Sequence, residues 1–351
     1  MAPSETNAHP LLVCSYEDRP AALDGLVFMA ESLFRVDPAI SLHLTVPDAP
    51  PAIRAWAQGR PEVTLSTERP DGVSGWDVKP WLLLHELSAG CEEVLWLDAD
   101  MIVTRPVSSM VAAFPPESLI VAEEWFLPEP RRLSSLWGLP TARAVVPVNS
   151  CFVRVTQFHR PLLERWLQMT RETRYRDAQM APMERRPFHL ASDQALLTAL
   201  LGTPEFGGVS LDYIRIGRHI AQCAGSSGYR PQHRILDLFR GLPPLIHCIG
   251  RKPWESRNNA GGMRGLMADV ATDVHPYVLA ARRVAKDLDV QCEWLEAKTL
   301  PGAVLRRLAF GHPGMTGLPL AIPHALLTQI KLFCERQRDR SRRPAAEVPI
   351  R

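Results

Sequence analysis

Residues 95–103 read LWLDADMIV and place two carboxylates at the end of a buried strand. The run Glu93–Leu97 (EVLWL) is apolar and β-rich, which predicts a strand that stops at Asp98. Asp100 follows after one residue, so both carboxylates reach one concave spot if the chain bends there. Oxygen ligands of this kind suit Mg2+ or Mn2+ holding a diphosphate. The segment therefore predicts a metal clamp, with a solvated turn as the structural alternative.

Strand and helix patterns alternate on both sides of this segment. Strands are expected at residues 11–15, 41–46, 63–66, 119–122, 145–155 and 246–249, and helices at 26–34, 53–58, 81–87, 161–169 and 193–201. Ser192 and Asp193 are good N-cap residues for the last of these helices. The alternation predicts an α/β fold with a parallel sheet. Because ligands bind beyond the carboxyl ends of strands in open α/β sheets, Asp98 and Asp100 would lie at the binding edge.

Composition excludes several classes of protein. The chain has 351 residues, of which 46% are apolar and 22% charged, as expected for one to three globular domains. A net charge of +2 provides no basic field for nucleic acid, and 32 prolines argue against long coiled coils. The seven cysteines include no CxxC pair, and no export signal is visible near Met1, so we expect a cytoplasmic location. The longest uncharged stretch, residues 308–330, contains three prolines and is a poor membrane span.

Charge separates the C-terminal region from the rest. From Pro276 onward, 13 basic and 7 acidic residues give a net charge of +6. We therefore expect a flexible N-terminus at 1–10, a first domain at 11–255 and a mainly helical region at 256–351. The basic tail at 331–343 follows an apolar run, which suits a peripheral membrane contact; a solvated helix end is the alternative.

A second motif, IHCIGRKPW at residues 246–254, follows much later in the chain. An expected strand ends there in His247, Gly250 allows close backbone approach, and Lys252 is long enough to reach a phosphate. A lone histidine of this kind is more often structural. Its presence in one chain with Asp98 and Asp100 favours a metal ligand instead.

Together these motifs resemble the GT-A fold glycosyltransferases, most closely glycosyltransferase family 8, over about residues 11–254. The resemblance implies a Rossmann-like mixed, mostly parallel sheet flanked by helices, with a helical C-terminal extension. In that family an LDxD strand end and an HxxGxxKPW motif bind Mn2+ and the diphosphate of a nucleotide sugar. The metal-ligand positions match Asp98, Asp100 and His247, and the donor-binding positions match Ala99, Gly250 and Lys252. Only one residue separates Gly250 from Lys252, where the family has two.

Three weaker matches occur in the family's order. In WDVKPW at 76–81, Lys79 matches a basic residue that contacts the donor; an ordinary surface lysine is the alternative. In VNSCF at 148–152, Asn149 and Ser150 match positions beside the donor sugar, although cysteine replaces the family's glycine at the next position. At a helix start, Asp193 matches a carboxylate that binds sugar hydroxyls and Gln194 an amide near the reacting carbon, the two proposed catalytic residues.

The segment after the first expected strand matches the uracil and ribose site of the family. It contains Ser15, Tyr16 and Asp18; Tyr16 is expected to stack on the base, and Asp18 to accept a ribose hydroxyl. The resemblance thus implies a metal-dependent, retaining transferase that moves a hexose from UDP-glucose or UDP-galactose to a hydroxyl acceptor.

The acceptor is not readable from the sequence, and a glycan, a lipid-linked molecule or a small molecule all remain open. It would bind at the segment 123–143, where Trp125, Phe126 and Trp137 are either sugar platforms or core residues.

Two other functions are compatible with the motifs. Asp98 and Asp100 also resemble the DxDx[TV] loop of haloacid dehalogenase-type phosphatases, in which the first aspartate is a nucleophile. A non-catalytic nucleotide-sugar binder is the second alternative.

Overall fold

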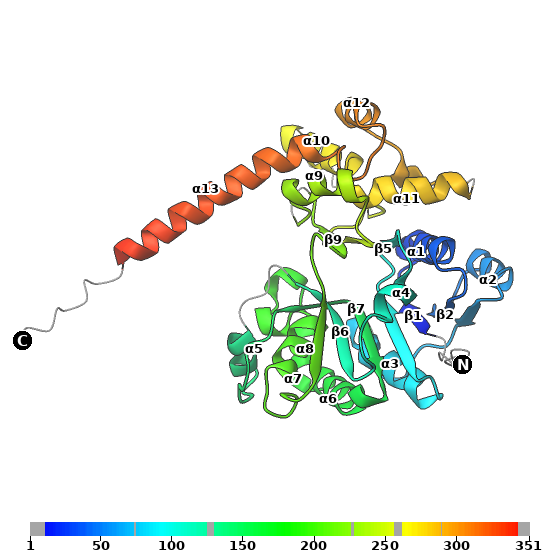
Figure 1. The fold of residues 1–351 in the computed structure, drawn as a ribbon, viewed down its shortest axis with the longest axis vertical. Coiled ribbons are helices and arrows are strands. Elements are labelled where there is room, and N and C mark those ends of the chain that lie inside the picture. Colours follow the sequence, from blue (N-terminus) through cyan, green and yellow to red (C-terminus); the bar gives the residue numbers. More distant parts are fainter. Residues whose placement is uncertain are drawn as a thin grey trace, which may run out of the picture. The chain divides into compact units, whose positions relative to one another are not determined.

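The computed structural model describes residues 11–73, 75–124, 130–225, 228–255, 262–288 and 290–342 (Figure 1). The chain forms two compact units. The first comprises Met1–Ala221 and Pro243–His247, and the second comprises Gln222–Leu242 and Cys248–Arg351. The N-terminus expected to be flexible, residues 1–10, lies outside the described residues.

The first unit contains a seven-stranded sheet in the order β3-β2-β1-β4-β7-β6-β8. Its strands are β1 (Leu12–Tyr16), β2 (Ser41–Thr45), β3 (Val63–Ser66), β4 (Glu93–Leu97), β6 (Ser118–Glu123), β7 (Val148–Thr156) and β8 (Ser210–Ile214). Strand β7 is antiparallel to its neighbours β4 and β6, and the other pairs are parallel. The expected mixed, mostly parallel α/β sheet is therefore confirmed.

Helices pack against this sheet through two apolar clusters. The helices of the first unit are α1 (Leu23–Val36), α2 (Pro51–Gln58), α3 (Val78–Ser88), α4 (Val107–Val111), α5 (Pro130–Leu136), α6 (Arg160–Thr170), α7 (Thr173–Gln179) and α8 (Asp193–Leu201). Helix α1 buries Leu26, Met29 and Leu33 at helical spacing in one cluster, and α3, α6 and α8 contribute to the other. Apolar packing on both sides explains why β4 and β7 are buried at nearly every position.

A short strand that the pattern did not predict brings the two motifs together. Strand β5 (Met101–Val103) follows β4 after a turn and pairs antiparallel with β10 (Leu245–Cys248), in a second sheet ordered β5-β10-β9 with β9 (Ile220–Cys223). In this register His247 lies opposite Met101. The imidazole therefore comes next to the residue that follows Asp100, although the two positions are far apart in sequence.

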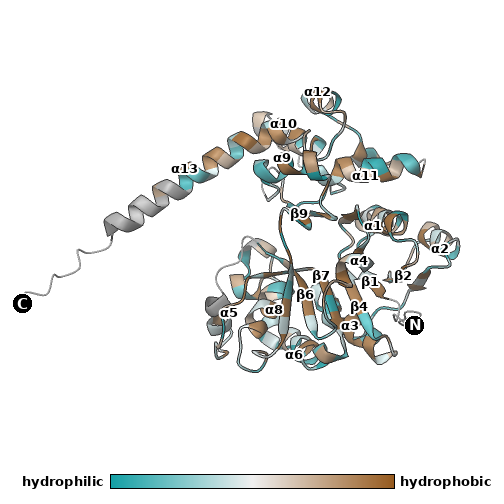
Figure 2. Cartoon of the chain, viewed as in Figure 1, coloured by the Kyte–Doolittle hydropathy of each residue, from teal (hydrophilic) through white to brown (hydrophobic). Residues whose placement is uncertain are grey.

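The second unit is mainly helical. It contains α9 (Pro231–Arg240), α10 (Gly262–Asp273), α11 (Pro276–Asp287), α12 (Leu300–Leu308) and α13 (Leu318–Arg342). Trp254, Tyr277 and Trp294 pack ring against ring, and the Thr299 hydroxyl caps α12 by accepting from the Gly302 amide. In the part of α13 that Figure 2 colours by hydropathy, hydrophobic and hydrophilic residues are interspersed. Within the described ranges, no helix combines the length and the apolarity needed to cross a bilayer.

Short 3-10 helices complete the chain. They lie at Pro20–Ala22, Gly75–Asp77, Gln157–His159, Met183–Arg185, Phe188–Leu190 and Glu293–Leu295.

Candidate functional site

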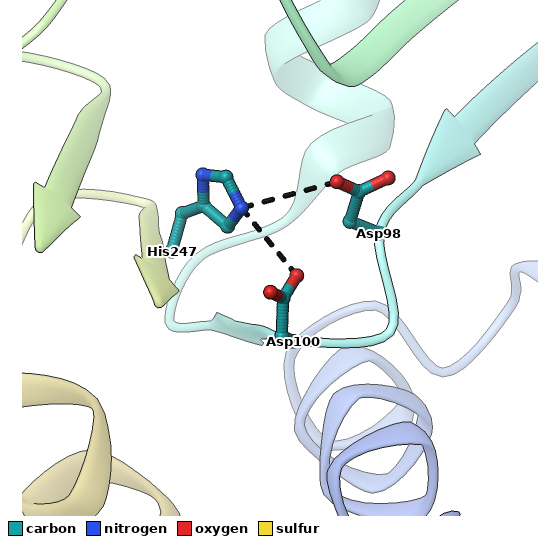
Figure 3. Close-up of side chains that lie close together, drawn as sticks. All are labelled: Asp98, Asp100 and His247. Carbon is teal, nitrogen blue, oxygen red and sulfur yellow. Dashed lines mark ion pairs between the residues drawn. The ribbon is translucent and has the colours of Figure 1, made fainter. Parts of the chain in front are cut away.

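Asp98, Asp100 and His247 form a candidate metal site within the first unit, called the metal triad below. The His247 Nε2 atom lies 3.4 Å from Asp100 Oδ1 and 3.9 Å from Asp98 Oδ2. One ligand atom from each residue lies within 4.8 Å of the other two. Figure 3 shows both carboxylates and the imidazole directed toward the same point. Asp100 and His247 are buried, whereas the Asp98 side chain is 23% exposed, so the triad is accessible from the Asp98 side.

These separations fit a divalent ion. An octahedral Mg2+ or Mn2+ holds its ligands at about 2 Å, so two ligand atoms on one ion lie about 3 to 4 Å apart. Two carboxylate oxygens and one imidazole nitrogen are ligands that Mn2+ accepts. The His247 Nδ1 atom is buried and makes no hydrogen bond to any described residue, so Nε2 is the nitrogen that faces the carboxylates. The three ligand atoms are thus close enough together, and of the right chemical kind, for one divalent ion.

Lys79 is a buried cation beside the triad rather than a surface lysine. It lies on α3, and its Nζ atom is 2.9 Å from Asp98 Oδ1 and 3.8 Å from Asp193 Oδ2. The ammonium also donates to the Ser150 carbonyl and hydroxyl oxygens at 3.1 and 2.9 Å. Burial alone would lower the pKa of Lys79, but the charges of Asp193 and Asp98 outweigh it and raise that pKa. The side chain therefore carries its positive charge at neutral pH.

Asp193 and Gln194 begin α8, as expected from the sequence. Asp193 is 2% exposed, and burial raises the pKa of its carboxyl while the nearby Lys79 ammonium lowers it. The Gln194 Nε2 atom donates to Glu124 Oε2 at 3.1 Å. Ser192 occupies the N-cap position, as expected, although its side chain makes no capping hydrogen bond.

Asn149 and Ser150 lie on β7, and both are buried. The Asn149 amide oxygen accepts from the Cys151 backbone N–H at 3.0 Å, and its Nδ2 atom donates to Glu124 Oε2 at 2.7 Å. Cys151, where the family has glycine, is fully buried in an apolar cluster. The β7 strand thus holds the Asn149 amide in one orientation.

Ser15, Tyr16 and Asp18 lie at the end of β1 and in the segment after it. The Tyr16 hydroxyl and the Arg69 Nη1 atom each donate to Asp18 Oδ2 at 3.1 Å. Tyr16 is only 8% exposed, and burial raises the pKa of its hydroxyl. Arg69 also lines a cavity of about 620 Å³ between β2, β3 and α3, together with Trp81. The roles expected for these residues toward base and ribose stay predictions.

Gly250 and Lys252 belong to the second unit. Gly250 has a φ of 76°, a conformation that favours glycine. The Lys252 Nζ atom donates to the Cys248 carbonyl oxygen at 2.5 Å, and its backbone N–H to Glu255 Oε2 at 3.0 Å. Their expected contact with a diphosphate stays a prediction.

Of the three aromatic residues singled out in segment 123–143, the structure describes only Trp137. Trp125 and Phe126 lie outside the described residues. Trp137 is 2% exposed, its Nε1 atom donates to the His189 carbonyl oxygen at 3.0 Å, and Arg174 stacks on its ring. Of the two roles that the sequence left open for Trp137, the structure supports core packing.

Sequence patterns missed three residues of the site, namely Arg19, Glu17 and Glu124. Arg19 forms a two-point ion pair with Glu17, its Nε and Nη2 atoms lying 2.8 and 2.7 Å from the carboxylate oxygens. The pKa of Arg19 is raised first by this hydrogen bonding and then by the charges of Asp100 and Asp98, so its guanidinium lies within the field of the triad. Glu124 accepts from two predicted site residues. None of the three belongs to a motif with characteristic spacing, so the sequence offered no signal.

Similarity to solved structures identifies the fold. No protein-family model matches the chain, and no curated protein matches it. Galactosyltransferase LgtC, solved with donor and acceptor sugar analogues, is 17% identical, with a TM-score of 0.51 over 80% of this chain and 98% of that one. The chain has a GT-A glycosyltransferase fold.

Two further similar structures have lower TM-scores. The glycosyltransferase GlyE of Streptococcus pneumoniae is 14% identical, with a TM-score of 0.43 over 83% of this chain and 66% of that one. A glycosyltransferase involved in glycosylation of the major capsid of PBCV-1 is 12% identical, with a TM-score of 0.39 over 75% and 98%.

Proposed function

We propose that the protein is a metal-dependent glycosyltransferase that moves a hexose from a nucleoside-diphosphate sugar to a hydroxyl acceptor. The observation that carries the proposal is the metal triad, three ligand atoms within 4.8 Å at a strand end of a GT-A fold. Residues 11–255 are proposed as the catalytic domain, with UDP-glucose or UDP-galactose as donor and a cytoplasmic location.

The departing diphosphate requires positive charge where its negative charge develops. A divalent ion held by Asp98, Asp100 and His247 would supply part of that charge as a Lewis acid. Lys79 carries a second charge within 2.9 Å of Asp98, and we propose that it contacts the donor phosphates or sugar. Ala99, Gly250 and Lys252 are proposed to complete the diphosphate site.

The sugar develops positive charge as the bond to the diphosphate breaks. We propose that Asp193 binds sugar hydroxyls and that Gln194 presents an electron-rich atom to the anomeric carbon. Asn149 and Ser150 are proposed to lie beside the sugar, and Tyr16 beside the base. Ser15 and Asp18 complete the proposed nucleoside site. Retention of anomeric configuration is proposed from the family 8 resemblance, and an NMR time course with the inverted anomer as first product would contradict it.

The GT-A fold argues against the phosphatase alternative. Asp98 Oδ1 accepts from Trp96 Nε1 at 2.6 Å and contacts the Lys79 ammonium, so this oxygen is engaged by two donors and is a poor nucleophile. A non-catalytic nucleotide-sugar binder would use the same site residues. It differs from the enzyme in that it binds the nucleotide sugar without turning it over.

Donor hydrolysis with and without Mn2+ tests the proposal. We expect the wild-type protein to release UDP from UDP-glucose or UDP-galactose with Mn2+, and EDTA to abolish the release. Asp100→Asn should lower the rate by at least about 100-fold, since one metal ligand loses its charge. Asp177→Asn changes an exposed carboxylate on α7 and should leave the rate unchanged. Binding of UDP-sugar without turnover would support the binder, and hydrolysis of a phosphomonoester without an acceptor would support the phosphatase.

We also propose a peripheral membrane contact through α13. Ile322, Leu326 and Ile330 repeat at four-residue spacing and are 43%, 61% and 59% exposed, and Lys331 follows them. In vesicle pelleting, we expect binding to phosphatidylcholine vesicles that contain phosphatidylglycerol and loss of binding in Leu326→Glu/Ile330→Glu. Thr328→Glu, which adds one charge to another side of the helix, should bind more strongly than the double variant. Equal pelleting of all three proteins would contradict the contact.

A further inference from the structure

Glu124 is a buried carboxylate at the end of β6 that no motif identified. It directly follows Ser118–Glu123 and is 4% exposed. Its backbone N–H donates to the Pro147 carbonyl oxygen at 2.8 Å, which fixes the chain where β6 ends. A buried carboxylate is costly unless hydrogen bonds satisfy it. The partners of Glu124 therefore indicate what the carboxylate is for.

Two side chains from different elements donate to one oxygen of this carboxylate. Asn149 Nδ2, from β7, lies 2.7 Å from Glu124 Oε2, and Gln194 Nε2, from the start of α8, lies 3.1 Å from the same atom. The Asn149 amide oxygen accepts from the Cys151 backbone N–H, so its NH2 group is the end that faces Glu124. Oε2 of Glu124 is thereby fixed as an acceptor independently of Gln194.

An acceptor at this point distinguishes the two ends of the Gln194 amide. An ionised carboxylate only accepts hydrogen bonds, so it attracts the NH2 group and repels the carbonyl oxygen. The orientation with Nε2 on Glu124 is the favourable one, and it leaves Oε1 as the end available to a ligand. Donation to a carboxylate also polarises the amide and increases the electron density on Oε1.

We propose that Glu124 is a positioning residue that sets the Gln194 amide so that its carbonyl oxygen, not its NH2 group, faces the donor sugar. This inference rests on the proposed function, in which positive charge develops on the anomeric carbon. A carbonyl oxygen stabilises that charge, whereas an NH2 group opposes it. Glu124 acts through Gln194 and forms no bond to the sugar itself.

Two variants of Glu124 test this role. Glu124→Leu removes the acceptor, so nothing holds the NH2 end of the Gln194 amide away from the sugar. We expect kcat for donor hydrolysis to fall by about 10-fold or more, with KM changed less than about threefold. Glu124→Gln keeps the shape of the side chain, and the Asn149 NH2 group orients the new amide so that its oxygen takes the place of Oε2. Gln194 then keeps its acceptor, and Glu124→Gln should recover most of the kcat that Glu124→Leu loses.

The contrast between the two variants separates positioning from a merely structural role. If Glu124 only joins β6 to β7 and α8, Glu124→Leu lowers the free energy of unfolding, while kcat of the folded protein stays within about threefold of wild type. Unchanged kcat in Glu124→Leu, or a loss of kcat in Glu124→Gln as large as that in Glu124→Leu, would overturn the proposal.

A second measurement does not depend on turnover. The side-chain NH2 signals of Asn149 and Gln194 in a 1H–15N spectrum are assigned by their loss in Asn149→Ala and Gln194→Ala. Both signals should shift in Glu124→Gln, because both groups donate to Glu124. An unshifted Gln194 signal would overturn the positioning role even in an active enzyme. Shifted signals in a protein that turns over no sugar nucleotide would instead overturn the proposed function and leave the contact established.

Discussion

Lys79 is the buried cation next to which two carboxylates lie, and Lys79→Met removes its charge while keeping a similar chain length. Asp193 is 2% exposed and Asp98 has a 23% exposed side chain, so neither is freely hydrated. Removing one partner of a buried ion pair costs about 3 to 5 kcal/mol, since it leaves an uncompensated charge. Because water reaches Asp98, we expect the lower end, about 3 kcal/mol at pH 8.

The pH dependence of this loss follows from Asp193. Burial already raises the pKa of Asp193, and without Lys79 that pKa rises further. A carboxyl with a raised folded-state pKa contributes stability below its unfolded pKa and loses it as the pH rises through the folded value. The penalty of Lys79→Met should therefore be largest at pH 8 and shrink as the pH is lowered and Asp193 takes up a proton.

Urea unfolding at pH 8 and pH 5, followed by tryptophan fluorescence, measures both effects. Lys79→Met/Asp193→Asn removes the more deeply buried of the two uncompensated charges and should recover about 1 to 2 kcal/mol of the loss at pH 8. Lys286→Met changes an exposed lysine of α11 and serves as the matched control, with an expected change below about 0.5 kcal/mol. A loss for Lys79→Met that is equally small, or that is the same at both pH values, would refute the reasoning.

Four other predictions follow from single residues. Burial raises the pKa of Asp77 to about 7, so its contribution to stability is lost as the pH rises through 7, and Asp77→Asn should raise the melting temperature at pH 8 but not at pH 5. Burial lowers the pKa of His275 to about 3, so stability falls as the pH drops below 6.5, and His275→Gln should flatten that fall in pH-dependent urea unfolding. Trp96→Phe removes a hydrogen bond to a proposed metal ligand and should weaken Mn2+ binding to the folded protein by about 10-fold or more in calorimetry; because Trp96 is buried, the free energy of unfolding should also fall, by about 1 to 3 kcal/mol. Gly228 has a φ of 80°, and a Cβ there would lie 2.0 Å from the Gln222 carbonyl oxygen, so Gly228→Ala should lose at least about 2 kcal/mol of unfolding free energy.

The hydrophobic pattern predicted those helices and strands whose own residues carry a clear pattern of apolar side chains. Residues 63–66, 93–97 and 193–201 were predicted with the bounds that the structure has. Residues 93–97 are a nearly continuous apolar run, residues 63–66 alternate apolar and polar side chains, and residues 193–201 form a mostly buried helix; each pattern is a local signal. Strand β5 has three residues, and its existence depends on pairing with β10, so no local pattern distinguishes it from a loop.

The site residues also fall into two groups, those with a local sequence signal and those that come together only in the folded chain. Asp98 and Asp100 were predictable because a strand end and two carboxylates are adjacent in sequence. The position of His247 depends on the β5–β10 register, and the sequence pointed to it as a ligand only because Asp98 and Asp100 occur in the same chain and because the motifs resemble those of the family. Glu124 had no signal, because its role comes from two side chains on β7 and α8 that meet it only in the folded chain.

Asp98 connects the proposed metal site with the proposed sugar site through its two oxygens. Its Oδ1 atom accepts from Trp96 Nε1 at 2.6 Å and contacts the Lys79 ammonium at 2.9 Å, and these two donors fix the carboxylate's rotation. Oδ2 is then the oxygen directed toward His247 Nε2. Because Lys79 also contacts Asp193, one cation holds a proposed metal ligand and a proposed sugar-binding carboxylate in a common frame. A metal placed by Oδ2 and a sugar placed by Asp193 would therefore keep a fixed distance, which transfer of a glycosyl group from a metal-bound diphosphate requires.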